Sequence, residues 1–135
     1  MLVARGARPV GSIGRILLCY DGSDHARRAA ALTTELAPRL GAEVHVLTVT
    51  DTPVTGADPA QVAAGLAASG VAAGAHVRPG DRRHPGAALL EAADQLDADL
   101  LVAGTRGRSA LASLLLGSVT HRLLQLAGCP VLVTR

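Results

Sequence analysis

The clearest candidate for chemistry in this chain is a glycine-rich stretch near its C-terminal end, GTRGRSALASLLLGS, which finishes at Ser118. Gly104 ends an aliphatic run, Gly107 follows it closely, and Gly117 comes after a spacer of nine residues. Glycine lets a backbone approach a ligand closely or adopt positive φ. At the start of an expected helix, the amides of Ser118 and Val119 would present N–H groups and a positive dipole end to an anion. These residues could therefore hold phosphate oxygens.

Spacing alone leaves two interpretations of this stretch open. In the first, Gly104 and Gly107 only form a tight turn, and Ser118 is an ordinary helix N-cap. In the second, the stretch binds phosphate mainly through backbone amides, with Arg106 or Arg108 adding positive charge. The choice depends on the elements that surround the stretch.

Residue types and spacing exclude several other kinds of site. All thirteen basic residues are arginine, so the P-loop and protein-kinase mechanisms, which need a lysine, are absent. No two glycines stand two residues apart, which excludes the dinucleotide motif GxGxxG, and the hydrolase motif GxSxG is missing as well. The five histidines show no paired ligand spacing, which disfavours a zinc site. We therefore assign no catalytic residue and no metal ligand from the sequence.

Composition indicates one globular domain without a nucleic-acid or membrane partner. The chain has 135 residues, 49% of them apolar, which suffices for a buried core. It has one tyrosine and no phenylalanine or tryptophan, so it lacks stacking platforms for bases, and a net charge of +2 is too small to imply a polyanion. No stretch approaches the length of a membrane span.

The N-terminal segment and the cysteines favour a cytoplasmic protein. Residues 1–13 carry arginines but no apolar stretch long enough for a signal peptide, so we expect a flexible tail before a domain at 14–135. Cys19 and Cys129 are expected to be reduced thiols, although the sequence alone leaves a disulfide open.

Short aliphatic runs alternate with segments of helical periodicity along the domain. The expected bounds are 15–20, 42–49, 71–77, 99–104 and 130–134 for the strands, and 23–40, 58–69, 87–96 and 118–128 for the helices. This alternation predicts an α/β domain with a five-stranded parallel sheet and helices on both faces. Ligands of such sheets bind at the carboxyl ends of the strands, where the loops YDGSD, VTD and GTRG begin.

The complete pattern G-x2-G-x9-G-[ST] resembles the nucleotide-binding signature of the universal stress protein family. The stretch ILLCYDGSDHARRAAALTTELAPRLGAEVHVLTVTD is similar to that family's first strand, first helix and second strand. The stretch DADLLVAGTRGRSALASLLLGSVTHRLLQLAGCPVLVTR resembles its C-terminal third. The resemblance covers nearly the whole chain and favours the phosphate interpretation over the turn.

The resemblance implies an open sheet of order 3-2-1-4-5, of the adenine-nucleotide alpha-hydrolase-like fold, with ATP and Mg²⁺ between strands one and four. By position, the implied contacts are Asp21 for the adenosine, Cys19, Val49 and Ala103 for the adenine pocket, Gly104 and Gly107 for the ribose and phosphates, and Gly117, Ser118 and Val119 for the phosphates. Two alternatives stay open: Cys19, Val49 and Ala103 as plain core residues, and Asp21 as only a cap for the following helix.

The chain departs from the family pattern at two places, and the resemblance also implies a second copy of the chain as a partner. Arg106 stands where the family commonly has histidine, which leaves its contact with a phosphate open. The segment 51–70 is shorter than usual, so we expect a truncated second helix and third strand. Family members pair through the last strand, here 130–134, whose exposed aliphatic edge would need a partner in a homodimer.

The sequence thus predicts a cytoplasmic stress-response regulator that binds ATP and acts as a homodimer. A slow ATPase or phosphotransfer enzyme that uses the same site is one alternative. A nucleotide-free module that binds other proteins is another, and the complete glycine signature disfavours it.

Overall fold

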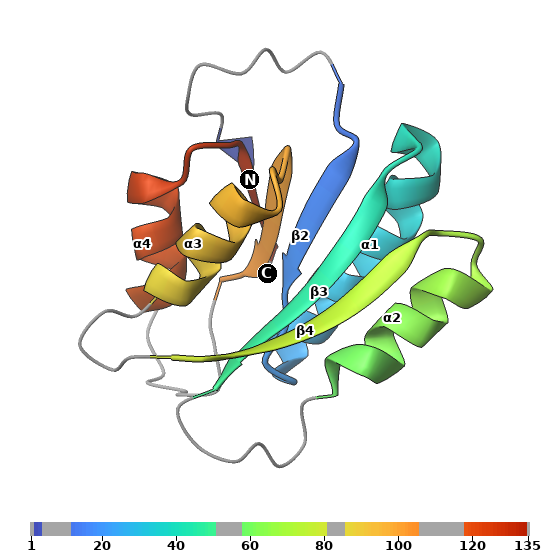
Figure 1. Ribbon diagram of the computed structural model, residues 1–135, viewed down its shortest axis with the longest axis horizontal. Helices are drawn as coiled ribbons and strands as arrows, with labels where there is room; N and C mark the ends of the chain where they lie inside the picture. The colour runs from blue at the N-terminus through green and yellow to red at the C-terminus, as the bar shows by residue number, and fades with distance from the viewer. Residues whose placement is uncertain (1, 4–11, 51–57, 81–85, 106–117, 135) are drawn as a thin grey trace.

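The computed structural model describes residues 2–3, 12–50, 58–80, 86–105 and 118–134 (Figure 1). The strands are β1 (Leu2–Val3), β2 (Arg15–Cys19), β3 (Glu43–Thr50), β4 (Ala73–Pro79), β5 (Leu100–Gly104) and β6 (Val131–Thr134), and the helices are α1 (Asp24–Leu40), α2 (Pro59–Ala68), α3 (Ala87–Gln95) and α4 (Ser118–Leu126). Each element expected from the sequence is present, with its ends shifted by a residue or two.

The strands form one sheet in the order β1-β6-β5-β2-β3-β4. From β2 onward every pairing is parallel, so the five expected strands have the order 3-2-1-4-5, as the resemblance implied. The strand order reverses at β2, which lies between β3 and β5. The loops that follow β2 and β5 therefore begin side by side at the carboxyl edge of the sheet.

The sixth strand, β1, was not expected from the sequence. Leu2 and Val3 lie antiparallel to β6, opposite Leu132 and Val131. The edge of β6 offers backbone groups that need partners, and these two residues supply some of them. The structure thus differs from the expected tail at Leu2 and Val3, while residues 4–11 lie outside the described residues.

Two apolar clusters, one on each face of the sheet, hold the helices in place. Leu17, Leu47 and Leu101 pack with α3 and α4, whereas the alternate residues Ile16 and Leu18 pack with α1 and α2. Figure 1 shows the two helix layers on opposite sides of the sheet. Because successive side chains of a strand point to opposite faces, aliphatic runs such as RILLC supply both clusters at once.

Helix α1 runs back from the carboxyl edge, and its ends are defined by local hydrogen bonds. The backbone N–H of Ala26 donates to Oγ of Ser23 at 3.1 Å, so Ser23 is the N-cap. Gly41 ends the helix with a φ of +62°, a conformation that glycine adopts without strain. Pro38 lies in the last turn and does not stop the helix before Leu40.

The truncation expected after β3 relative to the family stays a prediction, and residues 51–57 lie outside the described residues. Helix α2 has ten residues and β4 has seven, and β4 pairs with β3 along its whole length. Asp58 caps α2 by accepting from the N–H groups of Ala60 and Gln61. None of the helices in the described part of the chain is long and apolar enough to span a lipid bilayer.

Candidate functional site

The residues implicated by the sequence gather at the carboxyl edge of the sheet, where the strand order reverses. Cys19 ends β2, and Asp21 lies two residues beyond it. Val49 is the second-to-last residue of β3, and Gly104 ends β5. Because β2 pairs with both β3 and β5, the ends of these three strands are neighbours. This is the position at which open parallel sheets bind ligands.

Asp21 begins the tight turn that leads from β2 into α1. Its Oδ1 accepts a hydrogen bond from the backbone N–H of Ser23 at 2.9 Å, and the intervening Gly22 has a φ of +79°. Asp21 therefore supports the turn, while the cap itself is Ser23. Among the described residues no hydrogen bond reaches its Oδ2, and the side chain is partly exposed, so one oxygen can still contact a ligand.

The three apolar candidates share the side of the sheet that carries α3 and α4. Ala103 belongs to the buried cluster there, and Cys19 and Val49 are partly buried against it. The same three residues therefore form a continuous apolar surface at the ends of β2, β3 and β5. That surface fits both a plain core and one wall of a pocket for a flat apolar ring.

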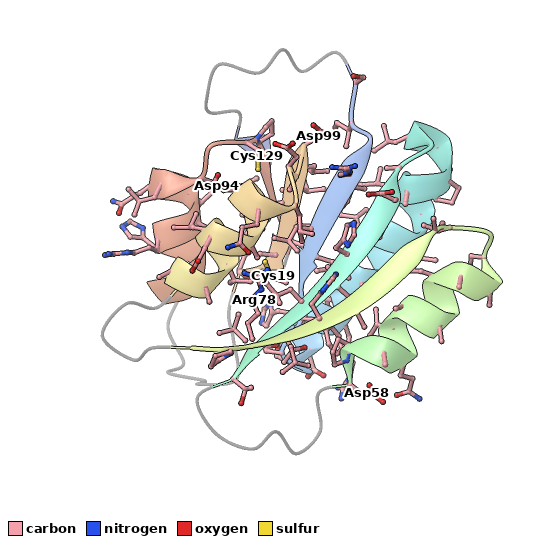
Figure 2. The ribbon with its side chains drawn as sticks, in the orientation of Figure 1. Cys19, Asp58, Arg78, Asp94, Asp99 and Cys129 are labelled. Atoms are coloured by element: carbon pink, nitrogen blue, oxygen red, sulfur yellow. The ribbon has the colours of Figure 1, made fainter. Side chains whose placement is uncertain are left out.

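Cys19 and Cys129 are not joined in a disulfide (Figure 2). Although Cys19 keeps some exposure, burial of its thiol raises its pKa far above the usual range, and the nearby Asp21 carboxylate raises it further. The thiol therefore stays protonated and is no nucleophile. A neutral thiol suits an uncharged ring more than a phosphate.

Gly104 has a packing role that the sequence did not reveal. A Cβ built on it would lie 2.7 Å from Cβ and 2.9 Å from the backbone carbon of His25, in the first turn of α1. Next to it, Oγ1 of Thr105 and Nδ1 of His25 are 3.0 Å apart, and the N–H of Thr105 donates to the carbonyl of Thr134. Glycine is thus needed where β5 meets α1.

His25 and Thr105 are the residues at this edge that the sequence analysis missed. His25 directly follows the loop YDGSD, and Thr105 is the second residue of GTRG, both of which had been singled out. The signal that could have found them is the side-by-side placement of these loops in a parallel sheet, which brings their flanking residues into contact.

The remaining candidates lie partly beyond what the structure describes. Arg106, Gly107 and Gly117 fall outside the described residues, and of Ser118 and Val119 only the backbone is described, at the start of α4. Because α4 connects the parallel strands β5 and β6, it must begin at the carboxyl edge and run back (Figure 1). The N-terminus of α4 therefore lies at the same carboxyl edge of the sheet as Asp21.

Comparison with known proteins gives a consistent family. The profile described as Universal stress protein family matches residues 12–79 and 63–135. The chain is 39% identical over 133 residues to a universal stress protein of Thermus aquaticus, covering 89% of this chain and 97% of that one. It is 33% identical over 139 residues to another of Methanocaldococcus jannaschii, covering 90% and 81% of the two chains.

Solved structures agree with the fold. A universal stress protein in complex with cAMP has a TM-score of 0.72 and 27% identity, covering 93% of this chain and 98% of that chain. UspA from Lactobacillus plantarum has a TM-score of 0.78 at 23% identity (93% and 99%), and the protein from Archaeoglobus fulgidus in complex with dAMP has 0.67 at 19% (91% and 98%). With the profile and the two relatives, these matches establish that this chain belongs to the universal stress protein family.

Proposed function

We propose that this protein binds ATP at the carboxyl edge of β2 and β5 and serves as a cytoplasmic, stress-linked nucleotide sensor. The observation that carries the proposal is the convergence of Asp21, the surface of Cys19, Val49 and Ala103, and the N-terminus of α4 on one edge. The binding of cAMP and dAMP by two structural neighbours supports an adenine nucleotide as the ligand.

Each part of ATP would have a contact among the candidate residues. The adenine would lie against Cys19, Val49 and Ala103, and Oδ2 of Asp21 would accept a hydrogen bond from the adenosine. Gly104 and Gly107 would face the ribose and phosphates. The phosphates would be held at Gly117, Ser118 and Val119, and the N-terminus of α4 favours their negative charge. The guanidinium of Arg106 would add positive charge near the phosphates, but a long side chain is held less firmly than a backbone amide.

Mg²⁺ fits this arrangement as an ion that arrives with the nucleotide. It keeps several waters and binds through phosphates and one or two carboxylates. Asp21 is a partly exposed carboxylate at this edge that could contribute. A dedicated protein cage for Mg²⁺ is not required.

The chemistry of the edge favours binding over fast turnover. The chain contains no lysine that could stabilise charge in a phosphoryl transition state. The Cys19 thiol is protonated and so offers no nucleophile. We therefore expect ATP hydrolysis, the main alternative function, to be slow at most.

Adenine nucleotide is expected to be released from the purified, untagged protein on denaturation, and stripped protein is expected to bind ATP at one site per chain. The first quantity is measured by chromatography of the released small molecules and the second by calorimetric titration. Competition by AMP and cAMP measures how much the additional phosphates of ATP contribute to its affinity. No nucleotide on denaturation together with no heat of ATP binding would contradict the proposal.

We further propose a homodimer through the β6 edge, residues 130–134. In the structure, β1 pairs with this same edge at Val131 and Leu132, so a partner's strand would compete with β1 for it.

Weakening β1 is therefore expected to raise the dimer fraction. Val3→Pro removes a backbone N–H from β1 and disfavours its pairing. The molar mass is measured by light scattering over a concentration series, with Ala7→Pro as the matched control. Equal molar mass for Val3→Pro and the control at every concentration would argue against a dimer at this edge.

A further inference from the structure

A hydrogen bond between two side chains ties the start of α1 to the carboxyl end of β5. Oγ1 of Thr105, the residue after β5, lies 3.0 Å from Nδ1 of His25, the second residue of α1, and the contact is partly buried. The two residues are 80 positions apart in the chain. This hydrogen bond therefore joins the two loops that flank the proposed nucleotide site, YDGSD and GTRG.

Backbone contacts bring the hydroxyl and the ring together. The N–H of Thr105 donates to the carbonyl of Thr134 at 2.8 Å, which continues the pairing of β5 with β6 beyond Gly104. A Cβ built on Gly104 would lie 2.7 Å from Cβ of His25, so the missing side chain lets α1 approach the strand closely. The contact thus joins two short side chains on closely packed backbone, whose positions are well defined.

The pair lies on the α1 side of the sheet. Ala103 belongs to the cluster that packs with α3 and α4, whereas the next residue, Gly104, faces His25 of α1. The surface of Cys19, Val49 and Ala103 therefore lies on the side of the sheet away from His25. An adenine bound on that surface would not touch His25, so the ring can affect the site only through the backbone that it holds.

The chemistry of the two groups makes their hydrogen bond independent of protonation. A threonine hydroxyl can donate one hydrogen bond and can also accept. The hydroxyl of Thr105 can donate to Nδ1 of His25 when the neutral ring carries its proton on Nε2. It can accept from Nδ1–H in the other tautomer and in the imidazolium. The contact can therefore persist in every protonation state of His25.

We propose that His25 and Thr105 are positioning residues for the nucleotide, which hold Asp21 and Gly104 at a fixed separation before the ligand arrives. This inference rests on the ATP site proposed above. Asp21 supports the turn into α1, and Ser23 in that turn caps the helix, so the turn is fixed to His25. Gly104 precedes Thr105 directly. The hydrogen bond thus sets the distance between the proposed adenosine and ribose contacts.

Without this hydrogen bond, the edge would have to be arranged at the moment of binding. When a ligand binds one arrangement only, its apparent dissociation constant rises by the reciprocal of the population of that arrangement. One hydrogen bond changes such a population by about three- to tenfold. ATP, which would contact both Asp21 and Gly104, should lose affinity by this factor. A residue that only stabilised the fold would leave the affinity of the folded protein unchanged.

Thr105→Val and His25→Leu are each expected to weaken ATP binding by about three- to tenfold in a calorimetric titration. The double variant should bind about as weakly as either single variant, because the same hydrogen bond is lost in all three. Thr105→Ser keeps the hydroxyl, and His25→Asn keeps a polar atom at the position of Nδ1, so both should restore the affinity of the wild type.

The matched control is Thr34→Val, which removes a partly buried hydrogen bond from Oγ1 of Thr34 to the carbonyl of Ala30 within α1. This variant should lose stability without losing ATP affinity. Equal ATP affinity in Thr105→Val, Thr34→Val and the wild type would overturn the proposal.

Hydrogen exchange tests the same junction without a nucleotide. The N–H of Thr105, which donates to the carbonyl of Thr134, reports local opening of the junction. This amide is expected to exchange about three- to tenfold faster in His25→Leu than in the wild type, and at the wild-type rate in His25→Asn and Thr34→Val. Unchanged exchange in His25→Leu would contradict the proposal. A wild type that binds no ATP would contradict the proposed function itself, and faster exchange in His25→Leu would then still support the junction.

Discussion

Replacing Gly104 with alanine is expected to lower the free energy of unfolding by about 1–3 kcal/mol, as overpacking of a close contact does. The added Cβ would lie 2.7 Å from Cβ and 2.9 Å from the backbone carbon of His25. Neither atom is the end of a flexible side chain, so β5 and α1 must move apart. Urea denaturation of the variant and the wild type measures the difference.

ATP affinity is expected to fall together with stability in the Gly104→Ala variant. The contact lies beside the turn of Asp21 and Ser23, which α1 positions, so a shift of α1 moves the proposed adenosine contact as well. If instead Gly104 serves only the ligand, Gly104→Ala would lose affinity while its denaturation midpoint stays at the wild-type value.

Gly65→Ala provides the matched control. Gly65 is exposed in α2, and a Cβ built there meets nothing within 4 Å. Alanine at this helical position is expected to raise stability by about 0.5–1 kcal/mol. A loss of stability in both variants would mean that any added methyl group is harmful, and the close approach at Gly104 would lose its support.

Gly104 also shows why the sequence interpretations of the glycine stretch were incomplete. A tight turn formed by Gly104 and Gly107 and a direct ligand contact were the two possibilities. The φ of Gly104 is not positive, so no left-handed backbone requires glycine at this residue, while Gly107 lies outside the described residues. Gly104 packs closely against His25 in α1, which lies 79 positions earlier in the chain, and no local pattern reveals such a contact.

The helices and the five parallel strands were predictable because each is long enough to carry its own periodicity. The aliphatic run RILLC can only be a strand buried on both faces, and α1 is bounded by Ser23 and Gly41 in a recognisable way. The order of the strands came from the resemblance to a family, since periodicity does not say which strands pair. The two-residue strand β1 is too short to leave any such signal.

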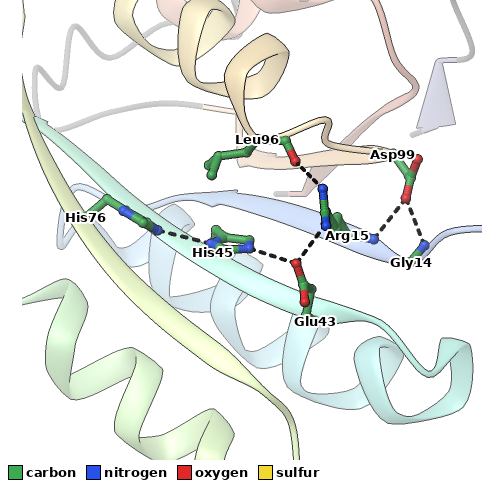
Figure 3. Close-up of polar contacts among 7 residues, drawn as sticks. All are labelled: Gly14, Arg15, Glu43, His45, His76, Leu96 and Asp99. Carbon is green, nitrogen blue, oxygen red and sulfur yellow. Dashed lines mark hydrogen bonds and ion pairs between the residues drawn. The ribbon is translucent and has the colours of Figure 1, made fainter.

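A contact between two histidines illustrates the same limit within the sheet (Figure 3): Nδ1 of His45 on β3 and Nε2 of His76 on β4 are 3.0 Å apart. The two residues are 31 positions apart in the chain, so no local pattern predicts that they meet. Their contact depends on the register of β3 against β4, in which His45 lies opposite Gly74. A shift of one residue would turn one ring to the other face. The candidate residues at the carboxyl edge were easier to find because each follows the end of a strand.

Replacing Asp21 with asparagine is expected to weaken ATP binding by about 10–100-fold, which corresponds to one charge-assisted hydrogen bond of about 1.5–3 kcal/mol. Asparagine keeps an Oδ1 that can accept from the N–H of Ser23, so the turn into α1 survives. It replaces Oδ2 with an N–H₂ group, which cannot accept a hydrogen bond from adenosine. Calorimetric titration measures the affinity, and urea denaturation measures the stability.

Comparison with Asp21→Ala separates the contact with adenosine from the support of the turn. Alanine removes both oxygens, so it should weaken ATP binding as much as asparagine does and, in addition, lower stability by about 0.5–1.5 kcal/mol. Asp24→Asn controls for the loss of a nearby negative charge, because the Asp24 side chain is 81% exposed and pairs only with Arg27 among the described residues. If Asp21→Asn binds ATP like the wild type and only Asp21→Ala loses affinity, Asp21 acts through the turn alone. The adenosine must then be held by the surface of Cys19, Val49 and Ala103 without a carboxylate.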